Sequence, residues 1–140
     1  MNPQLARQLY SFVQRLRGEP VLQVLQELEE TQWCSLSQLE ELQWLKLKMM
    51  LDHAYENVPF YRKAFRSCGL VPDDIKDPSR LPLLPMLTKQ DIKENLEELQ
   101  AVNRAEPVSA FTTAGTTAQP IKVFKDRVTS AYQRAVMYRT

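Results

Sequence analysis

The sequence has few of the residues that build metal centres and disulfide frameworks. Among 140 residues there are two cysteines and one histidine. Cys34 and Cys68 lie far apart and have no metal-ligand spacing, so we expect no metal site and no required disulfide. Reduced thiols are the usual state of cysteine in the cytoplasm, which is the location we expect for this chain.

The sequence also lacks an excess of charge of either sign. It has 18 basic and 17 acidic residues, a formal net charge of +1. Such a chain has no broad attraction for nucleic acid or for an anionic membrane, so we expect no nucleic-acid partner. Residues 1–18 interrupt their apolar positions with Gln and Arg, which fits neither a signal peptide nor a membrane span. The hydrophobic content of 44% is ordinary for a soluble globular domain.

Apolar residues recur at helical spacing over most of the first 105 residues. The pattern predicts an amphipathic helix over 3–17, a second helix from Pro20, and a long third helix starting at a capping box of Ser37 and Glu40. We expect Met49 and Met50 to fill gaps in a core. The expected apolar face of the long helix consists of Leu39, Leu42, Leu45, Leu47, Met50, Leu51 and Ala54.

Prolines and capping residues divide the next part of the chain. A short helix is predicted over 59–67, with Gly69 just beyond its end, followed by an ordered, proline-rich connection over 71–85. Thr88 and Asp91 form a capping pair for a further helix. The buried stripe of that helix is expected at Ile92, Leu96 and Leu99, and its solvent side at Glu94, Glu97 and Glu98.

The single histidine, His53, falls on the long predicted helix beside an aromatic cluster. No nucleophile motif accompanies it. We therefore interpret it as a hydrogen-bonding structural residue, with a catalytic base as the alternative.

The stretch over 108–127, VSAFTTAGTTAQPIKVFKDR, has a composition suited to binding phosphate. Two apolar runs, over 108–111 and 121–124, predict strands that flank a threonine-rich loop around one glycine. Threonine hydroxyls donate to phosphate oxygens, a glycine permits positive φ, and consecutive N–H groups can form an anion nest. The alternative is an ordinary threonine-rich hairpin connection. The candidate nucleotide contacts are Thr112, Thr113, Gly115, Thr116, Thr117 and Lys122, and we assign no catalytic and no metal-binding residue.

This loop is not a Walker-type loop, because no glycine-lysine-threonine run opens a helix after it. A final helix is predicted over 128–139. The sequence thus predicts a mainly α chain with a small β-hairpin. Its expected divisions are a helical region over 1–105 and a strand-loop-strand with a helix over 106–140.

Three blocks together carry a resemblance to a known family. LDHAYENVPFYRKAF (51–65), LPLLPMLTKQDIKENL (81–96) and TTAGTTAQP (112–120) resemble the opening region of phenylacetate–CoA ligases and their capsule-biosynthesis CapK-type relatives, within the adenylate-forming superfamily. The resemblance implies the start of an α/β large domain of the adenylate-forming type after the helical region. It also implies ATP with Mg, a small carboxylic acid and coenzyme A as acceptor. The carboxylate attacks the α-phosphate of ATP to give an acyl adenylate and pyrophosphate.

The loop departs from the family pattern at three positions. Ala114 replaces a usual serine, Ala118 replaces the second glycine, and Gln119 stands where many members have lysine. The adenine-binding block, the acidic metal site and the lysine-bearing carboxyl-terminal domain of the family are not in this sequence.

We therefore expect an amino-terminal, truncated portion of such a ligase that is inactive alone. The alternative is a non-catalytic helical interaction module or pseudoenzyme descended from the family. Strand edges left open on the hairpin would favour self-association.

Overall fold

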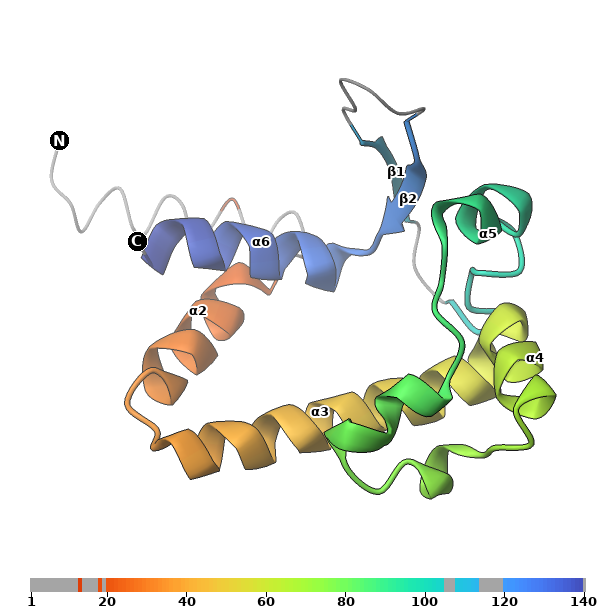
Figure 1. The fold of residues 1–140 in the computed structure, drawn as a ribbon. Helices are drawn as coiled ribbons and strands as arrows, with labels where there is room; N and C mark the ends of the chain where they lie inside the picture. Colours follow the sequence, from red (N-terminus) through yellow and green to blue (C-terminus); the bar gives the residue numbers. More distant parts are fainter. Residues whose placement is uncertain (1–12, 14–17, 19, 105–107, 114–119, 140) are drawn as a thin grey trace, which may run out of the picture. The chain divides into compact units, whose positions relative to one another are not determined.

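The computed structural model describes residues 13, 18, 20–104, 108–113 and 120–139 (Figure 1). The chain divides into two compact units. The first unit consists of the described parts of Met1–Ser35, Glu106–Phe111 and Phe124–Thr140, and the second of those of Leu36–Ala105 and Thr112–Val123. The helix predicted over 3–17 lies outside the described residues apart from Val13, which is helical.

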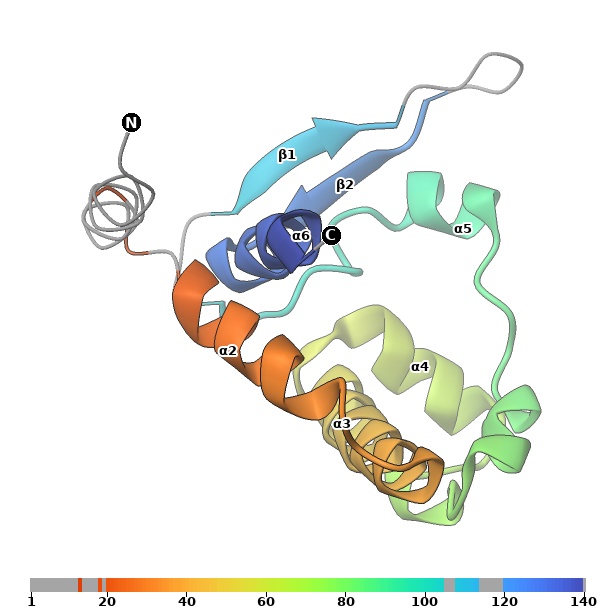
Figure 2. The same cartoon turned by 90° about the vertical axis from the view of Figure 1, so that its left-hand side faces the viewer.

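The first unit is built on two helices, α2 (Val21–Thr31) and α6 (Arg127–Arg139), which lie side by side in Figures 1 and 2. Val21, Ala131 and Ala135 are fully buried between them. The two alanines carry no bulk beyond Cβ, so the helices approach closely. The hydroxyl of Tyr132 donates to Glu27 Oε2 at 2.8 Å and links the same two helices. The start of α2 and both ends of α6 were predicted from the sequence to within one residue.

The second unit packs α3 (Leu36–Asn57) against α4 (Pro59–Ser67). Its core contains Phe65 and Ile75, each 1% exposed, together with Leu51. The rings of Tyr55 and Phe65 meet edge to face, with centroids 5.5 Å apart. Partly buried residues around this core are Trp44, Leu47, Tyr55, Leu70, Leu81 and Leu84.

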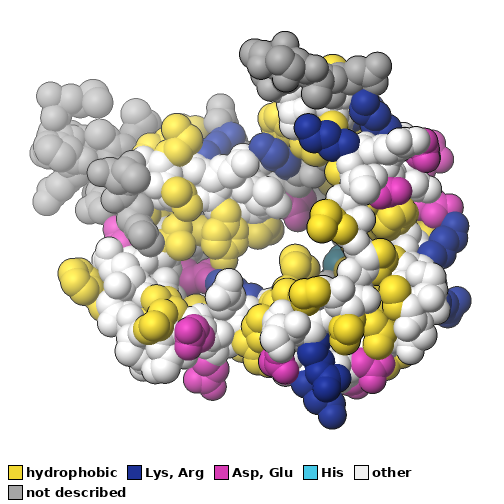
Figure 3. Space-filling model, in the orientation of Figure 1, with side chains coloured by type: hydrophobic (Ala, Val, Ile, Leu, Met, Phe, Trp, Pro, Cys, Tyr) yellow, Lys and Arg dark blue, Asp and Glu magenta, His cyan; other side chains and the backbone are white. Residues whose placement is uncertain are grey.

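Two expectations for α3 are wrong. The helix begins at Leu36, so Ser37 lies inside its first turn and not at the N-cap position that the predicted capping box requires. Met49 and Met50 are 64% and 59% exposed and fill no core. Hydrophobic side chains remain visible at the surface in Figure 3. The predicted apolar face of α3 was too wide because helical spacing identifies residues that can be buried, whereas burial also needs a neighbour.

The chain from α4 to α5 follows the prediction closely. Pro59 stands at the first turn of α4, and Gly69, at φ 66°, follows its end. The proline-rich connection is ordered as two short 3₁₀ helices, η1 (Pro72–Asp74) and η2 (Pro78–Leu83). The next helix, α5 (Lys89–Glu94), starts at the predicted cap, where Asp91 N–H donates to Thr88 Oγ1 at 3.1 Å. It ends earlier than predicted, and its expected apolar stripe, Ile92, Leu96 and Leu99, is only half-buried.

The strands β1 (Ser109–Thr112) and β2 (Lys122–Lys125) form a two-stranded hairpin. Each begins one residue later than predicted. The described part of the chain is thus mainly helical with a small β-hairpin, as expected from the sequence. The assignment of 1–105 and 106–140 to two regions of a larger enzyme stays a prediction.

Candidate phosphate-binding loop

The base of the threonine-rich loop is closed by one pair of residues. Thr113 N–H donates to the carbonyl of Ile121 at 2.9 Å, and Ile121 N–H donates to Thr113 Oγ1 at 3.0 Å. These two bonds continue the pairing of β1 and β2 by one step beyond the strands. They bring residues 113 and 121 together and leave residues 114–120 as the connection between them.

The described residues include three of the six candidate nucleotide contacts. Thr112 ends β1 with an exposed side chain, Thr113 closes the loop base, and Lys122 begins β2 with an exposed side chain. Gly115, Thr116 and Thr117 lie outside the described residues. The described residues therefore place two threonines and one lysine at or next to the base of the loop.

The positive charges after Lys122 are directed elsewhere. The ammonium group of Lys125 lies 4.6 Å from the centroid of the Phe111 ring and donates to Gln133 Oε1 at 3.1 Å. The guanidinium of Arg127 lies beside Gly18, where an added Cβ would come within 3.1 Å of its Nη1.

Asp126 joins β2 to α6 and caps that helix. Its carboxylate accepts from Thr129 N–H at 2.6 Å. The hydrogen bond from the backbone of Thr129 lowers the pKa of Asp126, and the Thr129 side chain lowers it further. In the same way, Ser79 lowers the pKa of Asp77 at the start of η2, and Thr88 lowers the pKa of Asp91 at the start of α5. All three carboxylates cap helices, so their lowered pKa values have a structural cause.

The segment that leads toward β1 is fastened to the junction of α3 and α4. Phe60 N–H donates to the carbonyl of Glu98 at 3.1 Å, and Val102 N–H donates to the carbonyl of Asn57 at 2.8 Å. Lys63 Nζ lies 2.7 and 2.8 Å from the two carboxylate oxygens of Glu98. The sequence prediction had Glu98 on a solvent side. Lys63 and Glu98 are 35 residues apart in the sequence, so no local pattern predicted their pairing.

The second unit also contains the single histidine. His53 is exposed, and its Nδ1 lies 3.3 Å from the side-chain nitrogen of Asn57. This contact confirms the prediction of a hydrogen-bonding histidine.

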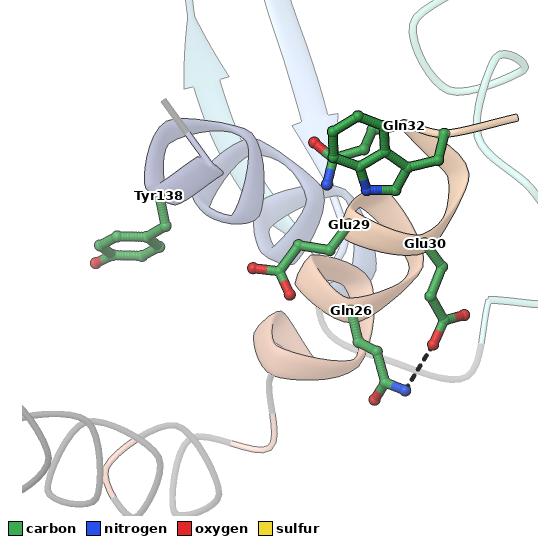
Figure 4. A pocket seen from close by; sticks show the side chains of 6 residues that line it. Gln26, Glu29, Glu30, Gln32 and Tyr138 are labelled. Carbon is green, nitrogen blue, oxygen red and sulfur yellow. Dashed lines mark hydrogen bonds between the residues drawn. The ribbon is translucent and has the colours of Figure 1, made fainter.

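In the first unit, a shallow depression of about 570 Å³ is lined by residues of α2, the turn after it and α6 (Figure 4). Gln26 donates to Glu30 there at 2.8 Å. The lining residues are Gln26, Glu29, Glu30, Gln32, Trp33 and Tyr138.

Cys34 and Cys68 are both free thiols. No group of three or more His, Cys, Asp or Glu side chains within the described ranges is arranged to hold a metal ion. In that same part of the chain, no helix is both long enough and apolar enough to cross a membrane.

The chain is similar to several phenylacetate-coenzyme A ligases. It is 39% identical to that of Escherichia coli (strain K12) over 98 residues, which are 69% of this chain and 22% of the relative. The same figures hold for the phenylacetate-coenzyme A ligase of Aromatoleum evansii. Identity to the phenylacetate-coenzyme A ligase of Pseudomonas putida is 38% over 56% of this chain. No family model matches the chain.

These matches support a relationship to phenylacetate-coenzyme A ligases. They agree with the resemblance expected from the three sequence blocks. The match spans about a fifth of the length of the relatives, 22% of each of the first two. The relatives carry the ligase name, and the CapK-type branch stays a prediction.

Proposed function

We propose that this chain carries the phosphate-holding loop of an adenylate-forming carboxylate–CoA ligase. The observation that carries the proposal is the hairpin base. In the block similar to the family's phosphate loop, Thr113 and Ile121 pair and close the residues between them into a loop. The proposed ligands are ATP with Mg, a small carboxylic acid, and coenzyme A as acceptor, in a cytoplasmic enzyme of the phenylacetate-coenzyme A ligase or CapK kind.

The described residues fit a polyphosphate group. Thr113 Oγ1 accepts from Ile121 N–H, and a hydroxyl that accepts one hydrogen bond still has its own proton to donate. Thr112 and Lys122 are exposed at the ends of the two strands next to the same base. Two neutral donors and one cation suit phosphate oxygens, and a bound nucleotide would supply the oxygens that hold Mg. In this proposal Thr112, Thr113, Gly115, Thr116, Thr117 and Lys122 bind and orient the phosphates.

The loop alone does not perform the reaction. Adenylation needs both reacting groups held in line and developing charge stabilised, by groups spread over an entire enzyme. We therefore expect no acyl adenylate from this chain alone. Pyrophosphate release above background with any aryl or acyl acid would contradict that expectation.

The proposal is tested by titrating Mg-ATP into the chain and following backbone amide signals by NMR. We expect shifts at Thr112, Thr113, Ile121 and Lys122. Lys122→Gln should weaken binding by about three- to tenfold, because an exposed charged hydrogen bond to phosphate is lost. The matched control is Lys76→Gln, which removes an exposed lysine outside the loop and should leave binding unchanged. Equal effects of the two variants, or no shifts in the hairpin, would refute the phosphate site.

The alternative is a non-catalytic helical interaction module derived from the same family. Ala114 and Ala118 favour it, because they remove a hydroxyl donor and a residue free to adopt positive φ. The same titration separates the two functions. A folded chain with no response to Mg-ATP would favour the module. Self-association through the hairpin edges is part of either proposal and is measured by the sedimentation of the chain.

A further inference from the structure

We propose that the α3–α4 junction is a latch that positions the base of the threonine-rich loop, with Lys63 and Glu98 as its positioning residues. The latch is defined by Asn57, Phe60, Lys63, Glu98 and Val102. It deepens the proposed function, because it assigns a role to residues that touch no ligand. It also gives a physical reason why the sequence block over 51–65 occurs together with the loop block over 112–120.

The latch has three connections between the same two segments. Phe60 N–H reaches the carbonyl of Glu98, and Val102 N–H reaches the carbonyl of Asn57. Lys63 pairs with the carboxylate of Glu98, where both oxygens lie within 2.8 Å of Nζ. This ion pair adds a side-chain contact to the two backbone hydrogen bonds. The segment over 98–102 is therefore fixed at both ends against the junction.

The junction itself is rigid enough to act as a reference. Pro59 fixes the start of α4, and Phe65 of the same helix is 1% exposed in the core of the second unit. Arg62 Nε donates to the carbonyl of Tyr55 at 3.0 Å, near the end of α3, and its Nη2 contacts the carbonyl of Glu56. These bonds satisfy carbonyl groups that the last turn of a helix leaves without partners.

The loop base depends on this junction for two reasons. Thr113 follows Val102 by only eleven residues, so fixing Val102 limits how far Thr113 can lie from the junction. Thr113 and Ile121 belong to the same compact unit as residues 36–104. Loosening the latch should therefore loosen the pairing of Thr113 with Ile121.

Amide hydrogen exchange tests the latch without any nucleotide. Lys63→Ala should raise the exchange rates of the Thr113 and Ile121 amides about two- to fivefold, the range expected from losing an exposed ion pair. The control is Lys48→Ala, which removes a different ion pair of this unit, Lys48–Asp73 at 3.4 Å, outside the latch. The charge-swapped double variant Lys63→Glu with Glu98→Lys should restore the slow rates. Equal exchange in both alanine variants, or no restoration by the swap, would overturn the proposal.

A second pair of variants tests the backbone bond. Val102→Pro removes the N–H that reaches Asn57, whereas Val102→Ala keeps it, and the side chain is 70% exposed in either case. Only the proline variant should raise exchange at Thr113 and Ile121. Equal rates in these two variants would also count against the latch. If the proline variant fails to fold, the Lys63 variants still decide the question.

The same variants separate this inference from the proposed function. If the wild-type chain binds Mg-ATP, Lys63→Ala should weaken binding by about the factor by which it raises exchange, while the urea midpoint follows that of Lys48→Ala. If Lys63 had only a structural role, Lys63→Ala would lower the urea midpoint more than Lys48→Ala does. The loss of Mg-ATP binding would then not match the rise in the exchange rates of Thr113 and Ile121. If the wild-type chain binds no Mg-ATP while exchange responds as expected, the proposed function fails and the latch stands.

Discussion

Replacement of Phe65 by alanine should have the largest effect of any single truncation in the second unit. The ring is 1% exposed, belongs to one cluster with Leu51 and Ile75, and meets Tyr55 edge to face. Removing such a side chain forfeits its burial and leaves a cavity, for a cost of about 3–5 kcal/mol. A domain of ordinary stability has about 5–15 kcal/mol in total. Phe65→Ala should therefore remove a large part of the stability of the second unit.

The two tryptophans make this change measurable in the second unit alone. Trp33 is 85% exposed, whereas Trp44 packs against the cluster that contains Phe65. In a Trp33→Phe background, fluorescence reports only Trp44. With a urea dependence of about 2 kcal/mol per molar, a loss of about 4 kcal/mol lowers the midpoint by about 2 M.

A matched control removes the same ring where it is exposed. Phe111 is 44% exposed and contacts the ammonium group of Lys125. Phe111→Ala should lower the urea midpoint reported by Trp44 little or not at all, because Phe111 belongs to the first unit and an exposed cation–π contact contributes about 1 kcal/mol or less. A loss below about 1 kcal/mol for Phe65→Ala, or equal losses for the two variants, would refute the assignment of Phe65 to the core.

Two further predictions concern helix ends. Gly69→Ala should cost about 1 kcal/mol in the same urea titration. Residue 69 has φ 66°, and an added Cβ meets no atom within 4 Å, so the substitution adds backbone strain only. An unchanged midpoint would argue against that backbone conformation. The lowered pKa of Asp126 means that its capping contribution is complete above the ordinary carboxyl value of about 3.9 and is lost as the pH falls through the lowered value in the folded state. Asp126→Asn caps without titrating, so its free energy of unfolding should fall less below about pH 4 than that of the wild type, and parallel curves would contradict this.

Local signals predicted the parts of the fold that depend on neighbouring residues. The capping pair of Thr88 with Asp91 and the bounds of α4 between Pro59 and Gly69 agree with the structure. Each feature depends on a backbone constraint imposed by residues a few positions apart, so it can be recognised directly in the sequence. The hairpin was found for the same reason, with each strand displaced by one residue.

Signals that depend on distant partners were less informative. Helical spacing placed Met50 on an apolar face, yet it is 59% exposed. Lys63 and Glu98 are 35 residues apart in the sequence, and no local pattern predicts that their two segments lie together. For the candidate site, sequence patterns supplied the residue types and the family, whereas the hydrogen bonds of Thr113 with Ile121 came from the structure.

Thr113 shows why a structural and a binding role need not exclude each other. Its oxygen accepts a hydrogen bond from Ile121 N–H, which closes the loop, and its hydroxyl proton remains to be donated. Serine would keep both capacities, and valine would keep neither. Ala114 has no such capacity, so the substitution there removes a donor without opening the base. In the proposed site, a loop altered in this way would keep its closure while losing affinity for phosphate, so closure and affinity should separate under substitution at residue 114 and should fall together in Thr113→Val.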